Sequence, residues 1–170
     1  MELFFKIATS ILEGFGIYSL FYIIVGSSSW RFSSKDERNF DEYACELVTK
    51  VGALFLIAWL LFLSRKHLTG PYWLATWIPF ILVLPSQFLW VKRLRAKIVI
   101  RVLVAFCLLI SVEDVVIRLT ALHRDYLPST WSSTISDWLV GLVQSLAIFL
   151  ISVLIFWIFT SAIQRRRIND

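Results

Sequence analysis

The chain has 170 residues, of which 58% are hydrophobic and 17% charged, and its mean hydropathy is +0.75. A soluble domain contains about 45–50% apolar and about 25% charged residues, so this composition excludes an ordinary soluble protein and predicts an integral membrane protein. The formal net charge of +5 does not require a nucleic acid partner, because the cytoplasmic loops of membrane proteins collect lysine and arginine. We therefore expect contact with the lipid bilayer and none with nucleic acid.

Five apolar segments are long enough to cross the membrane as helices, which takes about 20 residues for about 30 Å of hydrocarbon. The predicted fold class is all-α, a polytopic membrane helix bundle that forms one domain over residues 1–170. Its five transmembrane helices are expected at about residues 3–25, 43–64, 72–91, 98–119 and 136–163.

The first span carries an acidic residue, Glu13, in the middle of the sequence ILEGFGIY. The small residues Ser10 and Gly14 stand one turn apart beside it, and Gly141 and Ser145 repeat this spacing in the fifth span. Small residues at this spacing allow two helices to approach closely.

A polar segment between the first two spans carries a helix-start signature. Ser33 and Ser34 stand three residues before Asp36 and Glu37, as in a capping box, and apolar residues then recur at helical spacing over 40–51. We predict a cytoplasmic amphipathic helix that lies on the membrane surface and leads into the second span. An ordinary polar loop is the alternative.

The third span contains three prolines. Pro71 stands at a helix-start position, whereas Pro79 and Pro85 each remove a backbone hydrogen bond inside the span. We predict helix kinks at Pro79 and Pro85. Kinked helices occur in transporters and channels, and also in membrane proteins of every other kind.

The fourth span contains the sequence ISVEDVVIRL, in which three charged residues interrupt an apolar run. Asp114 and Arg118 are four residues apart and can pair along one helix face, whereas Glu113 points away from them and should face the bundle. The helical rise places all three in the outer part of the bilayer. We predict a polar cluster there, with residues of the first and fifth spans: Lys6, Glu13, Glu113, Asp114, Arg118 and Gln144.

Two interpretations of this polar cluster stay open. The groups can hold the helices together, pair with a partner protein, or in part face the outer water. Alternatively, they form a path for ions or protons, since buried intramembrane acids mark functional sites by default. Three acids and two bases nearly cancel, which favours the structural interpretation.

The distribution of basic residues predicts the orientation, because lysine and arginine concentrate on the cytoplasmic side. With the N-terminus outside, the outer side holds Lys6, Arg65, Lys66, Arg118 and Arg124, and the inner side holds the other 12 of 17 basic residues: Arg31, Lys35, Arg38, Lys50, Lys92, Arg93, Arg95, Lys97, Arg101 and Arg165–Arg167. The reverse orientation would place most of the basic residues on the outer side. A model with four spans, in which the second span is left out, gives nearly equal numbers of basic residues on the two sides. We predict a multi-pass protein of the bacterial inner (plasma) membrane, with its N-terminus outside and its C-terminus in the cytoplasm.

No catalytic, nucleotide-binding or metal-binding motif occurs in the sequence. Cys45 and Cys107 have no metal or redox spacing, and His67 and His123 fall at expected loop ends, so we expect no metal and no cofactor. The preferred hypothesis is a small non-enzymatic protein that acts as an accessory, assembly or interaction subunit of a membrane complex, with a membrane-protein partner or a second copy of itself. The alternative is a small transporter or channel, proton-coupled in one version, that uses Glu13 and Glu113. An intramembrane enzyme is a third hypothesis, against which the missing motifs count.

Overall fold

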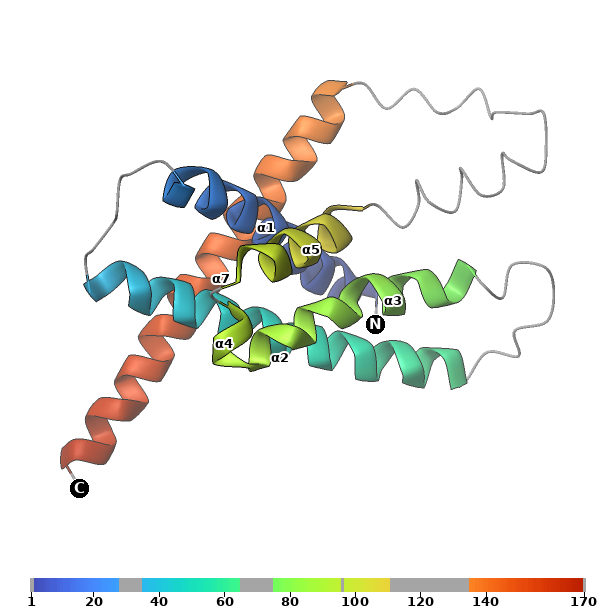
Figure 1. Ribbon diagram of the computed structural model, residues 1–170. Helices are drawn as coiled ribbons and strands as arrows, with labels where there is room; N and C mark the ends of the chain where they lie inside the picture. Colours follow the sequence, from blue (N-terminus) through green and yellow to red (C-terminus); the bar gives the residue numbers. More distant parts are fainter. Residues whose placement is uncertain (1, 28–34, 65–74, 96, 111–134, 170) are drawn as a thin grey trace, which may run out of the picture.

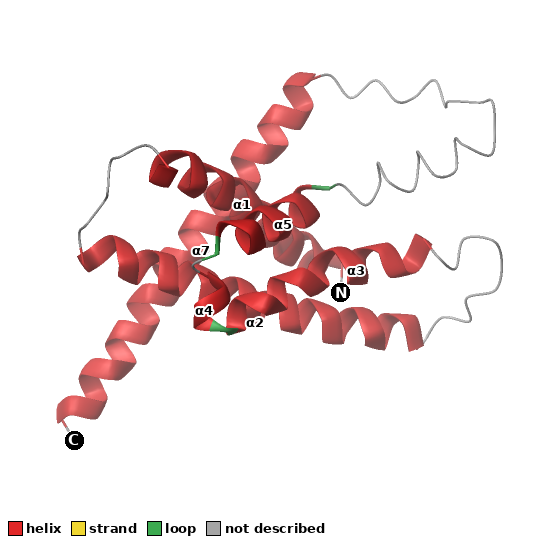
Figure 2. Cartoon of the chain, in the orientation of Figure 1, coloured by secondary structure: helices red, strands yellow, loops and turns green. Residues whose placement is uncertain are grey.

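The computed structural model describes residues 2–27, 35–64, 75–95, 97–110 and 135–169, and these residues are helical apart from short joints, with no strand among them (Figures 1 and 2). Three long helices are α1 (Glu2–Ser27), α2 (Lys35–Ser64) and α7 (Ile135–Asn169). Between them lie five shorter elements: η1 (Ala75–Trp77), α3 (Ile78–Val83), η2 (Leu84–Trp90), α4 (Lys92–Arg95) and α5 (Ile98–Leu109).

Within the described ranges, three helices are long and apolar enough to cross a membrane, over Glu2–Ile24, Phe40–Ser64 and Leu139–Ile163. They coincide with the first, second and fifth predicted spans. For the residues that it describes, the structure therefore confirms an all-helical fold with helices of membrane-spanning length and hydropathy. Two shorter apolar helical stretches, Ile78–Trp90 and Ile98–Leu109, lie where the third and fourth spans are predicted.

The predicted amphipathic segment and the second span form a single continuous helix, α2. It begins at Lys35, directly after the expected capping serines, which lie outside the described residues. From residue 41 onward its buried and half-buried positions recur at helical spacing, and Ala44, Cys45 and Val48 are fully buried. One face of α2 is thus packed against the bundle well before its most apolar part begins.

The third predicted span is a helix of mixed geometry. Pro79 lies in the first turn of α3, where the backbone N–H groups have no partner within the helix, so the missing N–H of proline costs no hydrogen bond there. Pro85 lies where α3 ends and the 3₁₀ helix η2 begins. The indole N–H of Trp59 on α2 donates to the Thr76 carbonyl oxygen at 2.8 Å, which supplies a partner for a carbonyl just before Pro79. The two prolines therefore mark changes of helix type.

The fourth predicted helix is shorter in the structure than the expected range of 98–119. Ile110 follows α5 with extended backbone (φ −70°, ψ 114°), so the α-helix ends at Leu109. Three of the predicted cluster residues, Glu113, Asp114 and Arg118, come after this point and lie outside the described residues.

Helix α1 is at the centre of the bundle. Figure 1 shows α7 crossing it obliquely, while α5 lies along another side. Its buried residues Ala8, Leu12 and Phe15 share a core with residues of the other helices, including Val104 of α5 and Phe149 of α7. In α1, 39% of the most apolar stretch is buried inside the bundle, compared with 17% in α7, so α7 is the more peripheral helix.

Candidate functional site

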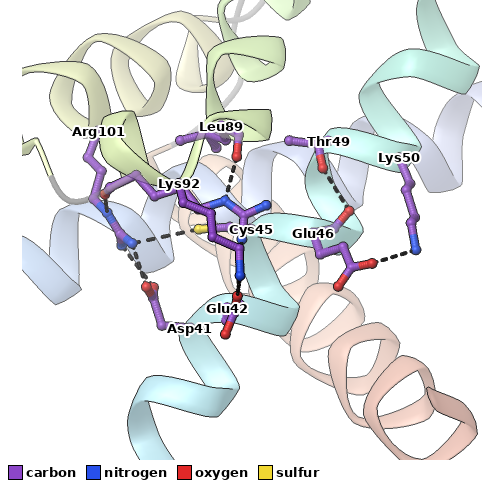
Figure 3. Close-up of polar contacts among 10 residues, drawn as sticks. Asp41, Glu42, Cys45, Glu46, Thr49, Lys50, Leu89, Lys92 and Arg101 are labelled. Carbon is purple, nitrogen blue, oxygen red and sulfur yellow. Dashed lines mark hydrogen bonds and ion pairs between the residues drawn. The ribbon is translucent and has the colours of Figure 1, made fainter. Parts of the chain in front are cut away.

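A buried ion pair joins α2 to α5 at one end of the bundle (Figure 3). The Arg101 guanidinium makes two parallel hydrogen bonds with Asp41, from Nη1 to Oδ1 at 2.9 Å and from Nη2 to Oδ2 at 2.5 Å. The Arg101 side chain is 4% exposed and that of Asp41 16%. Two charges so far out of solvent are tolerated only because this bidentate geometry pairs them.

Other groups surround the Arg101 guanidinium. Its Nε donates to the Arg95 carbonyl oxygen at 2.6 Å, and Nη2 lies 3.6 Å from the Cys45 sulfur. The ring of Tyr22 on α1 covers it, with the guanidinium carbon 4.4 Å from the ring centroid. A cation held over an aromatic face in this way gains further attraction, and more so when it is desolvated. The Arg101 guanidinium therefore has hydrogen-bond partners in its plane and an aromatic ring against its face.

Asp41 also connects the ion pair to α1. The Tyr18 hydroxyl donates to Asp41 Oδ1 at 3.2 Å. The Tyr18 ring packs against Phe149 of α7 at 5.6 Å between centroids and against Phe40 of α2 at 6.0 Å. Through Tyr18, Asp41 and Arg101, four helices meet at a single polar centre, which we call the Asp41–Arg101 centre.

The spacing of residues along α2 explains why this centre forms. Asp41, Cys45, Thr49 and Gly52 succeed one another at three- and four-residue intervals, so they lie on one face of the helix. Asp41 and Cys45 contact Arg101, the Thr49 backbone carbonyl accepts a hydrogen bond from Gln87 Nε2 at 3.3 Å, and a Cβ at Gly52 would lie 2.5 Å from the Ser86 hydroxyl. This polar stripe faces η2 and α5, and the short helix α4 connects the end of η2 to the start of α5.

Exposed ion pairs border the Asp41–Arg101 centre. Lys92 Nζ lies 2.9 Å from Glu42 Oε1, with side chains 80% and 50% exposed, and Lys50 Nζ lies 2.7 Å from Glu46 Oε1 within α2. Exposed pairs contribute about 0–1 kcal/mol each. Arg95 is more firmly held, because its Nε donates to the Leu89 carbonyl oxygen at 2.5 Å. The Lys92–Glu42 pair links the basic α4 turn to α2.

Chemically, the Asp41–Arg101 centre is suited to fixing helices. Its carboxylate and guanidinium are both engaged, so a ligand could bind them only by breaking the pair. Over the five described ranges, no group of three or more His, Cys, Asp or Glu side chains is placed to hold a metal ion.

Of the six residues of the predicted polar cluster, three lie in the part of the chain that the structure describes, and their surroundings differ. Glu13 faces α7, where the Ser145 hydroxyl donates to Glu13 Oε2 at 3.0 Å. Lys6 and Gln144 are exposed on α1 and α7. Glu113, Asp114 and Arg118 lie outside the described residues, so the cluster as a whole stays a prediction.

The Asp41–Arg101 centre is absent from the sequence-based prediction, which counts Arg101 among the inner basic residues and places Asp41 in the amphipathic segment. One signal pointed to it: Arg101 is the sole charged residue of α5, whose sequence is IVIRVLVAFCLL. Comparison of the chain with protein-family models, with curated proteins and with solved structures gives no match.

Proposed function

We propose that this chain is a small non-enzymatic membrane protein that acts as an accessory, assembly or interaction subunit of a membrane complex. The observation that carries this proposal is the position of α7. Figure 1 shows its C-terminal half leaving the bundle, and there Ile155, Ile158 and Phe159 are each more than 60% exposed. A groove of about 460 Å³ lies along the same stretch, beside Trp157, Ile158, Ser161 and Ala162. An apolar helix face with a groove is suited to receive another transmembrane helix.

The polar interior supports the same role. The Asp41–Arg101 centre holds four helices in place with a nearly neutral set of charges, as expected of a rigid scaffold. A small transporter or channel that uses intramembrane carboxylates is the second candidate, and the observation that favours it is Glu13, which lies beside an open cavity between helices.

For the topology, we propose five membrane passes, with the N-terminus outside and the C-terminus in the cytoplasm of a bacterial cell, so that the start of α2 is cytoplasmic. Figure 1 supports this arrangement, since the helices run back and forth and the two termini lie toward opposite ends. The stretch 75–90 also gains length from its 3₁₀ turns, which rise about 2.0 Å per residue, so it extends about 29 Å, close to the hydrocarbon thickness.

The topology predicts that tags at the two ends of the chain report opposite compartments. A periplasmic reporter enzyme should be active when it is fused before residue 1 behind a suitable export sequence, and a cytoplasmic fluorescent reporter should mature after residue 170. A third fusion within 92–97 should behave like the C-terminal one, because the basic turn is expected on the inner side. Both ends on one side of the membrane would contradict five passes.

The subunit role predicts that protein extracted in a mild detergent migrates on a blue-native gel as a complex larger than the monomer with its micelle. Replacing both Ile158 and Ala162 with tryptophan fills the groove on α7 and should shift the band to the monomer. The matched control is Ile81→Trp on the exposed side of α3, which should leave the band unchanged. A monomeric wild-type band would contradict the proposal and favour the second candidate.

A further inference from the structure

We propose that the basic turn over residues 92–97 binds the headgroup of an anionic phospholipid. The turn includes α4 and forms the bend between α3 and α5 (Figure 1). The inference depends on the placement of the chain in a membrane, and it goes beyond the subunit role, which concerns α7. Four of the six residues in the turn are basic: Lys92, Arg93, Arg95 and Lys97. A basic cluster of this size beside apolar helices is typical of segments that recognise anionic lipids.

Acidic residues of α2 neutralise only part of this turn. Glu42 Oε1 lies 2.9 Å from Lys92 Nζ and 4.0 Å from Arg95 Nη1. Asp41 and Glu46, on either side of Glu42 along α2, pair with basic residues outside the turn. These three acids are therefore already engaged, and the one that faces the turn meets Lys92 and Arg95.

Arg93 and Lys97 supply the charge that is available to a ligand. Both residues are exposed, and among the residues that the structure describes neither side chain makes a hydrogen bond or an ion pair. Arg95 differs, because its side chain is 14% exposed and its Nε donates to the Leu89 carbonyl oxygen. The phosphate of a lipid headgroup can accept two parallel hydrogen bonds from the Arg93 guanidinium and a further one from the Lys97 ammonium group.

Backbone hydrogen bonds hold the turn in a compact shape. The N–H groups of Leu94 and Arg95 donate to the Val91 carbonyl oxygen at 2.9 Å and 3.3 Å, and the Lys97 N–H donates to the Leu94 carbonyl oxygen at 3.1 Å. Lys97 is also the residue at which α5 begins, where its backbone is extended. Because the turn is already folded in this way, little ordering of the backbone opposes binding.

Exposed apolar side chains flank the turn on both sides. Trp90 and Val91 precede it and are each 51% exposed, and Ile98 and Val99 follow it and are 60% and 76% exposed. The indole N–H of Trp90 donates to Gln87 Oε1 at 2.9 Å. Tryptophan and apolar side chains next to basic ones are typical of segments at the membrane–water interface. These flanks are suited to contact acyl chains while the turn binds the headgroup.

Native mass spectrometry of the full chain in mild detergent, titrated with phosphatidylglycerol or phosphatidylcholine, tests this proposal. The wild type should bind the anionic lipid more tightly than the zwitterionic one. Arg93→Gln with Lys97→Gln should weaken phosphatidylglycerol binding about 30-fold, because each basic side chain beside an anionic lipid contributes about fivefold. The matched control, Lys6→Gln with Lys50→Gln, removes two exposed positive charges from α1 and α2 and should bind this lipid like the wild type.

Glu42→Gln should change binding in the opposite direction. It releases Lys92 from its ion pair, so phosphatidylglycerol should bind severalfold more tightly than to the wild type. A misfolded variant could not give this gain.

Photo-crosslinking locates the lipid on the wild-type chain. Phosphatidylglycerol with a diazirine in one acyl chain should label the stretch 90–99, and unlabelled phosphatidylglycerol should suppress this labelling, whereas phosphatidylcholine and inorganic phosphate should not. Suppression by inorganic phosphate would assign the turn to a free anion instead of a lipid. That result, or equal lipid binding by the Arg93/Lys97 variant and its matched control, would overturn the proposal. Neither result would bear on the subunit role, which is tested at α7.

Discussion

Replacing Arg101 with methionine should lower the free energy of unfolding by about 3–5 kcal/mol, because it leaves Asp41 charged and buried without its partner. Methionine keeps most of the volume of the side chain, so the loss comes from the missing charge and hydrogen bonds. Unfolding by sodium dodecyl sulfate from mild-detergent micelles, followed by circular dichroism, measures the change. The same substitution at Lys92, whose ion pair with Glu42 is exposed, is the control and should cost no more than about 1 kcal/mol.

A double variant separates the energy of the ion pair from that of its burial. With Asp41→Leu added to Arg101→Met, neither charge remains, and most of the lost stability should return, because apolar replacement of a buried ion pair is often neutral. Tyr18 then has no carboxylate to donate to, so a small deficit from its hydroxyl should persist. An Arg101→Met variant as stable as the wild type would show that the Asp41–Arg101 centre does not hold the helices together.

This centre also shows what the sequence could and could not predict. Long apolar runs are sufficient to predict α1, α2 and α7, because only a helix can satisfy its backbone within lipid. The partner of Arg101 was not predictable in the same way, since Asp41 lies 60 residues earlier and several other acids were equally available. The stripe of Asp41, Cys45 and Thr49 on α2 indicates a polar contact, but it does not identify the helix that supplies the other half.

The short elements differ from prediction for local reasons. The kinks at Pro79 and Pro85 stay predictions, and in the structure the two prolines lie where the type of helix changes. The end of α5 at Leu109 has no sequence signal, because neither glycine nor proline stands near it. The polar cluster around Glu113 stays a prediction; among its described members, Glu13 accepts a hydrogen bond from Ser145 of α7.

The small residues on α1 and α7 also show that sequence spacing alone does not identify which residues lie at a helix contact. Ser10/Gly14 and Gly141/Ser145 have equal spacing, yet α7 approaches α1 at Gly14 and Ser145, whereas a Cβ at Gly141 would meet nothing within 4 Å. At Gly14 an added Cβ would lie 2.5 Å from the Phe149 Cβ and would overlap the Ser145 carbonyl oxygen. Neither atom is the end of a flexible side chain, so the contact can be relieved only by moving one helix.

Gly14→Leu should therefore separate α7 from α1 and lower the free energy of unfolding by about 3 kcal/mol, the upper end for overpacking of a well-packed core. The Ser145–Glu13 hydrogen bond, which lies at the same crossing, should be lost with it. Limited proteolysis and detergent unfolding measure the loosening. Gly141→Leu, with the same change of side chain on the open face of α7, should unfold like the wild type. Equal stability of the two leucine variants would mean that α7 does not cross α1 at Gly14.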